Sequence, residues 1–252
     1  PRILSSAASD VYKRQDALPS KYHTQFFIRD KGDNPGLNLD ITHRCPLECL
    51  RCSRQIDFKR NNKPVWGQDI PLESIEKLAD AYKKIHFCGQ LSDPVHHPKF
   101  IEILEICYRK SARVIVHNAS SAKSESWYTK AFKAHPQATW QFGIDGLPEE
   151  SHKYRINQDG VKLFNIMLKA KEYGVTPLWQ YIIFKYNEEH IEEAKQMAKN
   201  NNVHIIFVYS AKWLGKDDPL RPSKDNHIFS PHHLLNFTKR KQHLLKPYEK
   251  EF

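Results

Sequence analysis

Three cysteines fall within eight residues, and their spacing is that of a metal site. Three residues separate Cys45 from Cys49, and two separate Cys49 from Cys52. Cysteine thiolates are the usual ligands of iron–sulfur clusters, so three of them on one loop can hold three corners of a cubane cluster. The fourth iron then stays open to a group that is not protein. Because the surrounding stretch 44–54 is rich in charged residues, the residues favour a metal site over a chance grouping of core cysteines.

Zinc is the alternative metal for this loop. Structural zinc normally takes four protein ligands, so it has to recruit His43 or Cys88 here, or accept an open catalytic position. The whole chain has five cysteines, which are too few for a disulfide scaffold. Three of them crowded together indicate metal chemistry in a reducing compartment. We therefore expect a cytoplasmic protein.

Composition bounds the class of protein. Apolar residues make up 40% of the 252 residues and aromatic residues 12%, enough for a sizeable core. No stretch approaches the roughly 20 apolar residues that span a bilayer, and no long apolar segment suggests a secretory signal. The 39 Lys and Arg against 29 Asp and Glu give a net charge of +10. This balance suits an anionic ligand, so a metal- or cluster-containing nucleic-acid-binding module is a second hypothesis, although no recognised nucleic-acid motif occurs.

The elements that must position these residues alternate along the chain. Short runs rich in Val, Ile, Phe, Tyr and Trp predict six strands, over 37–42, 85–88, 113–117, 139–144, 178–184 and 204–209. Amphipathic stretches predict helices between them, over 72–84, 99–109, 125–133, 161–173 and 188–201, with a sixth from Ser230 to about Leu245. Strict alternation predicts a parallel α/β sheet, either doubly wound or an incomplete barrel. In both, reactive groups belong at the carboxyl ends of the strands.

The cysteine loop directly follows the first predicted strand, and this arrangement resembles the hallmark of the radical S-adenosylmethionine (radical SAM) superfamily. The resemblance covers about Leu37 to Tyr209. It implies an incomplete (β/α)6 barrel of parallel strands with outer helices, and a [4Fe-4S] cluster held by Cys45, Cys49 and Cys52. It also implies that S-adenosylmethionine binds the open iron and is cleaved reductively to a 5′-deoxyadenosyl radical, which abstracts hydrogen from a substrate. One departure is Arg51, at a position that is commonly aromatic in the family.

The end of the second predicted strand resembles the family segment Gly-Gly-Glu-Pro, which holds the methionine ammonium. Aligning Pro94 places Asp93 at the Glu position and Ser92 at the second Gly. A carboxylate acceptor for the ammonium is thereby kept. Leu91 stands where the first Gly allows close backbone approach. A simple Asp-Pro turn before a helix is the alternative.

The later strand ends resemble the peptide-modifying, SPASM-type branch of the superfamily. Asn118 follows the third strand, and the resemblance implies a hydrogen bond to the cofactor; a turn residue is the alternative. Asp145 and Arg155 match a signature that implies cofactor binding by both residues; in it Arg155 partners the methionine carboxylate, with a surface salt bridge as the alternative. Gly143 stands where that signature usually has Ser, and Gln180 is expected to face the cofactor unless it only packs in its strand.

That branch usually carries a C-terminal extension whose cysteines bind auxiliary clusters, but no cysteine follows Cys107 here. We therefore expect one cluster per chain, with Cys88 and Cys107 as small buried residues. The paired histidines (His96, His97, His232 and His233) are expected to be solvated. The expected partners are S-adenosylmethionine, an electron donor such as a flavodoxin or ferredoxin, and a peptide or protein substrate; neither a membrane nor nucleic acid is expected.

Three regions are predicted. Residues 1–36 form an N-terminal extension, of which 1–15 resemble a translated sequencing adapter because Asp10–Gln15 matches its codons. Residues 37–210 form the radical SAM core. Residues 211–252 form a C-terminal loop and helix, expected to be truncated.

Overall fold

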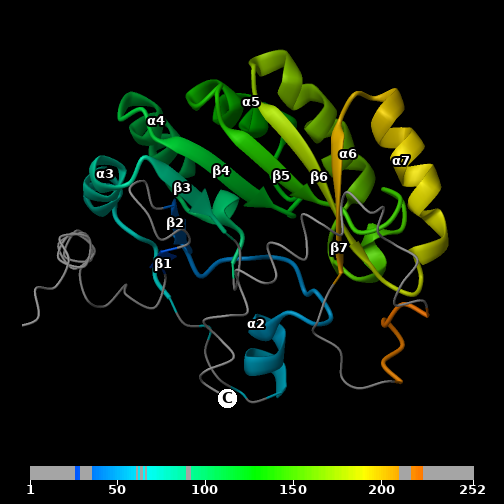
Figure 1. The fold of residues 1–252 in the computed structure, drawn as a ribbon. Coiled ribbons are helices and arrows are strands. Elements are labelled where there is room, and N and C mark those ends of the chain that lie inside the picture. The colour runs from blue at the N-terminus through cyan, green and yellow to red at the C-terminus, as the bar shows by residue number, and fades with distance from the viewer. Residues whose placement is uncertain are drawn as a thin grey trace, which may run out of the picture.

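The computed structural model describes residues 26–28, 36–60, 62, 65, 67–88, 92–209 and 217–223. Its centre is one curved sheet whose strands follow each other in chain order (Figure 1). The strands are β1 (Phe26–Ile28), β2 (Gly36–Leu39), β3 (Lys84–Phe87), β4 (Arg113–Asn118), β5 (Thr139–Gly143), β6 (Thr176–Ile183) and β7 (His204–Tyr209). Strands β2 to β7 are parallel, and β1 pairs antiparallel with β2.

This order decides between the two predicted architectures. A doubly wound sheet reverses its strand order at a switch point, whereas β2 to β7 run in sequence without reversal. The sheet does not close, because β1 and β7 lie at its two ends. The chain therefore has the predicted incomplete (β/α)6 barrel, and the doubly wound alternative is wrong.

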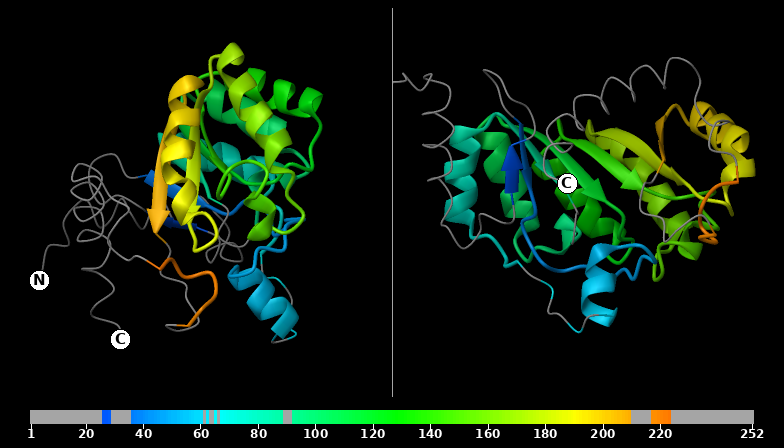
Figure 2. Two further views of the ribbon diagram at one scale, coloured as in Figure 1. Left: turned by 90° about the vertical axis from the view of Figure 1, so that its right-hand side faces the viewer. Right: turned by 60° about the horizontal axis from the view of Figure 1, so that its bottom comes forward.

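Five helices connect the parallel strands and cover the outer face of the sheet (Figures 1 and 2). They are α3 (Leu72–Ala81), α4 (Phe100–Arg109), α5 (Glu125–Ala134), α6 (Gly160–Ala170) and α7 (Ile191–Asn200). Two of these helices begin at an N-cap side chain. Ser124 accepts a hydrogen bond from the N–H of Trp127 at the start of α5, and Asp159 accepts one from that of Lys162 at the start of α6. Short 3-10 helices occupy Pro94–His96, Ser151–Lys153, Lys171–Tyr173 and Glu188–His190.

The two faces of the sheet differ in chemistry. Along β4, β5 and β6 the residues under the helices are fully buried and apolar, with Val116, Trp140 and Trp179 as examples. Burying a side chain of this kind contributes roughly 1.5–3 kcal/mol. The alternate residues, such as His117 and Gln141, face the inside of the open barrel and line a cavity there. The strands therefore have one apolar face and one mixed face, on which polar residues such as His117 and Gln141 and apolar residues such as Ile182 line the cavity.

The structure also contains elements that the sequence pattern did not predict. Strand β1 was missed, and so was the short helical segment after the cysteines, formed by α2 (Ser53–Gln55) and the π-helix Ile56–Arg60. This segment stands apart from the helices that cover the sheet (Figure 2). The predicted strand 37–42 ends earlier, at Leu39. The sixth predicted helix lies outside the described residues.

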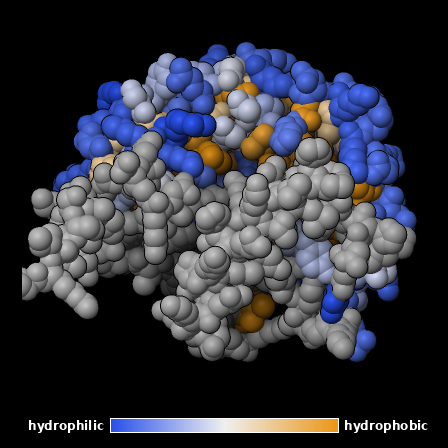
Figure 3. Space-filling model, in the orientation of Figure 1, coloured by the Kyte–Doolittle hydropathy of each residue, from blue (hydrophilic) through white to orange (hydrophobic). Residues whose placement is uncertain are grey.

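On the face that Figure 3 shows, the described part of the chain is mostly hydrophilic along the outer rim, with small apolar areas inside it. This is the pattern of amphipathic helices that turn their apolar side to the sheet. Among the described residues, no helix has the length and apolar character needed to cross a membrane.

Candidate cofactor site

A cavity of about 330 Å³ opens at the carboxyl ends of the parallel strands, the expected place for a site in this architecture. All three predicted metal ligands line it: Cys45, Cys49 and Cys52. It is also lined by most of the other predicted site residues, namely Ser92, Asp93, Asn118, Arg155 and Gln180. Groups from five strand ends therefore meet around one space, as the sequence predicts.

Backbone hydrogen bonds hold the cysteine loop in place. Within the loop, the N–H of Cys52 donates to the carbonyl of Cys49 at 3.1 Å. The N–H of Leu50 donates to the carbonyl of Tyr154 at 3.2 Å, which ties the loop to the segment that follows β5. Burial raises the pKa of Cys45 to about 12 and that of Cys49 to about 11. These thiols are protonated at neutral pH, so a bound metal has to displace their protons.

The arrangement of the cysteines bears on the choice of metal. A single zinc ion needs its ligands to converge, because each Zn–S bond is about 2.3 Å long. In the part of the chain that the structure describes, no three His, Cys, Asp or Glu side chains are gathered in this way, and neither His43 nor Cys88 completes such a group. The cysteines instead lie along the wall of a cavity. Three thiols in one cavity wall are the donor set that a cubane cluster takes.

Asp93 is a buried acceptor at the edge of this cavity. One carboxylate oxygen accepts the N–H groups of Ala119 and Ser120, each at 2.8 Å, and the other accepts that of Val95 at 3.2 Å. Burial raises the pKa of Asp93 to about 6, although these hydrogen bonds act to lower it. The side chain thus joins the turn after β3 to the end of β4. Asp93 therefore does stabilise the turn, as the alternative interpretation expects. An ionised carboxylate has about four acceptor sites, and three are used here, which leaves one for a ligand.

Ser92 and Asn118 are both engaged with protein groups. The hydroxyl of Ser92 donates to the carboxylate of Asp40 at 3.0 Å. The amide of Asn118 donates to the hydroxyl of Tyr128 at 2.8 Å and accepts from the N–H of Ser120 at 3.0 Å. Both side chains line the cavity, but their orientation is fixed by these bonds. Asn118 therefore shapes the turn after β4.

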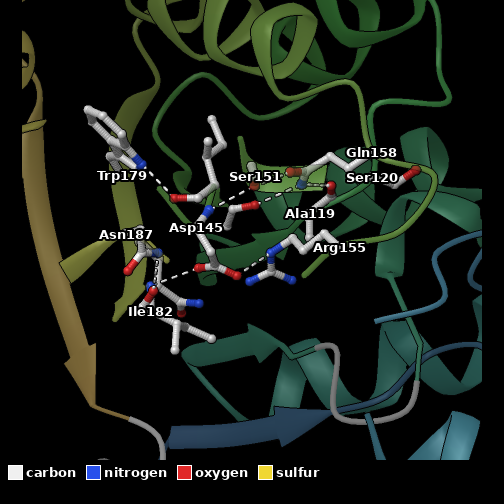
Figure 4. A network of polar contacts seen from close by, with 12 residues as sticks. Ala119, Ser120, Asp145, Ser151, Arg155, Gln158, Trp179, Ile182 and Asn187 are labelled. Atoms are coloured by element: carbon white, nitrogen blue, oxygen red, sulfur yellow. Dashed lines mark hydrogen bonds and ion pairs between the residues drawn. The ribbon is translucent and has the colours of Figure 1, made fainter. Parts of the chain in front are cut away.

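Asp145 and Arg155 form a buried ion pair, with 2.7 Å between the carboxylate and Nε (Figure 4). The second oxygen of Asp145 accepts the N–H of Ile182 at 2.7 Å. Burial raises the pKa of Asp145, and Arg155 opposes that rise. Burial also disfavours the charge on Arg155, yet Asp145 raises the pKa of the guanidinium above its usual value. Asp145 was predicted to bind the cofactor, but it is not among the residues that line the cavity; it instead holds Arg155 from behind. The alternative of a surface salt bridge is wrong, because the side chains of Arg155 and Asp145 are only 11% and 0% exposed.

Gly143 makes room for this arginine. A Cβ atom at position 143 would lie 2.6 Å from Nη2 of Arg155 and 2.9 Å from its Cζ. Both distances are well below a van der Waals contact. The departure from Ser at this position therefore has a structural reason, because the guanidinium occupies the place of the missing side chain.

A second set of polar residues was missed by the sequence analysis. The hydroxyl of Ser151 accepts the N–H of Asp145 at 2.8 Å and donates to the side chain of Gln158. The amide of Gln158 in turn donates to the carbonyls of Ala119 and Gly143, the latter at 2.9 Å (Figure 4). Gln158 thereby joins the ends of β4 and β5 to the loop that carries the arginine. No spacing or motif signals this network, because its members belong to ordinary polar residue types.

Gln180 faces the cavity together with Gln141 of the neighbouring strand. The amide of Gln141 donates to the side-chain oxygen of Gln180, and both residues line the cavity. The expectation that Gln180 faces the site is consistent with this position. Whichever way the two amides are turned, one shared hydrogen bond leaves them at least one acceptor and one donor. The pair thus offers neutral hydrogen-bonding groups to whatever fills the space.

Two smaller expectations need correction. His97 is buried, not solvated, and its ring contacts the carbonyl of Ile70 at 3.0 Å. His96 is half-buried and contacts the hydroxyl of Ser120 at 2.8 Å. Cys107 is buried in the core as expected, but Cys88 is only half-buried and lines the cavity. His232 and His233 lie outside the described residues.

Comparison with known proteins gives structural matches only. No family model matches the chain, and neither does any curated protein. Among solved structures it is similar to Streptococcus suis SuiB bound to S-adenosylmethionine, with a TM-score of 0.61 and 11% identity over 100% of this chain and 56% of that one. It is similar to anSMEcpe with bound AdoMet, with a TM-score of 0.56 and 16% identity over 83% of this chain and 60% of that one. A third is methylornithine synthase (PylB), with a TM-score of 0.57 and 11% identity over 95% and 69% of the two chains.

These three proteins are radical SAM enzymes. At such low identities the similarity establishes the fold, so the chain has the incomplete barrel of the radical SAM enzymes. It spans a little over half the length of SuiB and 60% of anSMEcpe. The activity and the partners of the whole protein therefore belong to the proposal that follows.

Proposed function

We propose that this protein is a radical SAM enzyme whose cavity holds a [4Fe-4S] cluster and S-adenosylmethionine. One observation carries the proposal: in a fold shared with structures that have AdoMet bound, the three cysteines and most of the predicted cofactor residues line one cavity at the strand ends. When bound, the reduced cluster supplies the electron that cleaves S-adenosylmethionine to a 5′-deoxyadenosyl radical. Cys45, Cys49 and Cys52 hold it by three thiolates, which leaves one iron for the methionine moiety.

The protein groups around the cavity bind and orient S-adenosylmethionine. Arg155 supplies the positive charge for the methionine carboxylate, and Asp145 fixes its guanidinium from behind. Asp93 uses its remaining acceptor site for the methionine ammonium, with Ser92 and Asn118 shaping the wall beside it. Gln180 hydrogen-bonds the adenosine part. A polar, preorganised wall of this kind replaces water around the reacting groups.

The charge in the cavity argues against the nucleic-acid-binding alternative. Two of the three described arginines that line the cavity have carboxylate partners, because Arg51 contacts Asp218 and Arg155 contacts Asp145, while Arg54 donates to the carbonyl of His43. A nucleic-acid site needs cations that can meet phosphates. With Arg155 assigned to the methionine carboxylate and Arg51 paired with Asp218, this space does not offer, among the described residues, the several cations that a phosphate backbone requires.

For the substrate we propose a peptide or protein. The support is a structural neighbour, SuiB bound to the precursor peptide SuiA, with a TM-score of 0.60 and 12% identity over 96% of this chain and 50% of that one. An electron donor such as a flavodoxin or ferredoxin reduces the cluster, and the reaction takes place in the cytoplasm.

Binding of S-adenosylmethionine to the anaerobically reconstituted protein tests the proposal. We expect Arg155→Gln to raise the dissociation constant by roughly tenfold or more, because a charge-assisted contact contributes about 1.5–3 kcal/mol. Arg109→Gln is the matched control, since this arginine is exposed on α4 and pairs with the surface residue Glu76. Calorimetry that finds no binding to the wild-type protein, or equal binding by both variants, contradicts the proposed site.

A further inference from the structure

The residue before the third cysteine makes a long-range contact that the resemblance does not explain. The guanidinium of Arg51 donates two hydrogen bonds to the carboxylate of Asp218, from Nε at 3.0 Å and from Nη2 at 2.9 Å. The two side chains are 12% and 0% exposed. The fork geometry of such a pair fixes orientation as well as distance. The partners are 167 residues apart in the chain.

The segment that carries Asp218 is itself held in place. The N–H of Leu220 donates to the carboxylate of Asp218 at 3.0 Å, and the carbonyl of Leu220 accepts the N–H of Lys185 at 3.0 Å. The N–H of Ser223 donates to Glu188 at 2.9 Å. Residues 217–223 are thus fixed to the connection between β6 and α7. Through Arg51, this segment, which follows β7, is joined to the cysteine loop, which follows β2.

The same loop carries a second arginine–aspartate pair for comparison. Arg44, on the other side of Cys45, contacts Asp69 at 2.8 Å, but its side chain is 50% exposed and that of Asp69 is 27% exposed. An exposed pair contributes little to stability. Removing one partner of a buried pair instead leaves an uncompensated charge, which is strongly destabilising. The two pairs thus share residue types and location and differ in burial.

We propose that the Arg51–Asp218 pair is a latch that fixes the cysteine loop in the conformation that receives the cluster and covers that side of it from solvent. Arg51 is flanked by Leu50 and Cys52 and itself lines the cavity, so its position sets the path of the backbone between the second and third cysteines. Both residues are positioning residues, because they act through the loop. This inference rests on the proposed function for the identity of the group that the loop holds.

The apo protein gives the first test, by hydrogen exchange of the amide of Cys52, which donates to Cys49 within the loop. We expect Asp218→Asn, which keeps the shape and removes the charge, to speed this exchange by roughly tenfold or more, because the loop then opens locally. Asp69→Asn is the control and should change it by less than about twofold. Arg51→Lys keeps the charge without the fork and should fall between them.

Cluster chemistry gives the second test. After anaerobic reconstitution, the cluster absorbance of Asp218→Asn should decay in air several-fold faster than that of the wild type and of Asp69→Asn. The charge exchange Arg51→Asp with Asp218→Arg should recover part of the loss. Equal exchange and equal decay in all variants overturn the latch. If the wild-type protein takes up no cluster, the proposed function fails, while the hydrogen-exchange result still decides the latch.

Discussion

Gly143→Ala provides the most specific perturbation of the site. The added Cβ would lie 2.6 Å from Nη2 of Arg155 and 2.9 Å from Cζ, against 3.4 Å from the side chain of Ala119. The guanidinium has to shift, and because it is largely buried and held by the carboxylate of Asp145 at 2.7 Å, we expect the shift to weaken this ion pair. Overpacking at a filled site costs about 1–3 kcal/mol. We expect a loss of unfolding free energy in this range for the apo protein.

A double-mutant cycle isolates the cause. In the background of Arg155→Ala the clashing atoms are absent, so adding Gly143→Ala should cost less than about 0.5 kcal/mol. Urea unfolding of the wild type, the two single variants and the double variant gives the four unfolding free energies of the cycle, and all four proteins are measured without cofactor. A cost of Gly143→Ala that is the same in both backgrounds refutes the assignment of the clash to Arg155.

Three further outcomes follow from the site. Asp93→Asn should lower the unfolding free energy by about 1–3 kcal/mol, because an amide has one acceptor oxygen for the N–H groups of Ala119 and Ser120 and a third from the turn; unchanged urea unfolding contradicts this. Burial lowers the pKa of His96 to about 4, so between pH 6.5 and 4 the unfolded chain takes up a proton that the folded chain excludes. The unfolding free energy of the wild type should then fall by about 1 kcal/mol relative to that of His96→Gln between pH 7 and pH 5. This value is smaller than the full pKa shift implies, because the half-buried ring is partly screened by solvent. If the difference in unfolding free energy between the two proteins stays constant across these pH values, the expectation is wrong. Cys88→Ala should leave the iron content of reconstituted protein unchanged, and a loss of iron would make this thiol a ligand.

The sequence was sufficient for the order of the elements. Alternation of short apolar runs with amphipathic stretches predicts six β/α units, because apolar residues recur at different spacings in strands and in helices. Periodicity carries no information on strand order, so it left the doubly wound and barrel forms open until the resemblance was considered. Strand β1 is three residues long and lies below what a pattern can detect.

Residues of the cavity wall could be predicted where a residue type and its spacing carry chemistry. Cys45, Cys49 and Cys52 belong to this group, and Arg155 follows from a signature after β5. The contacts that orient these residues come from distant segments and ordinary polar types. Nothing local marks Asp218 as the partner of Arg51, or Gln158 as the link between two strand ends. Such partners depend on the folded geometry alone.

The most direct test of the proposed function is the formation of 5′-deoxyadenosine by the reconstituted protein with reductant and S-adenosylmethionine under anaerobic conditions. The proposal predicts about four irons per chain and product formation by the wild type. It predicts loss of both with Cys45→Ala, Cys49→Ala or Cys52→Ala. Product formation that persists in any of these variants, or its absence from wild-type protein that carries the full complement of iron, would contradict the central claim.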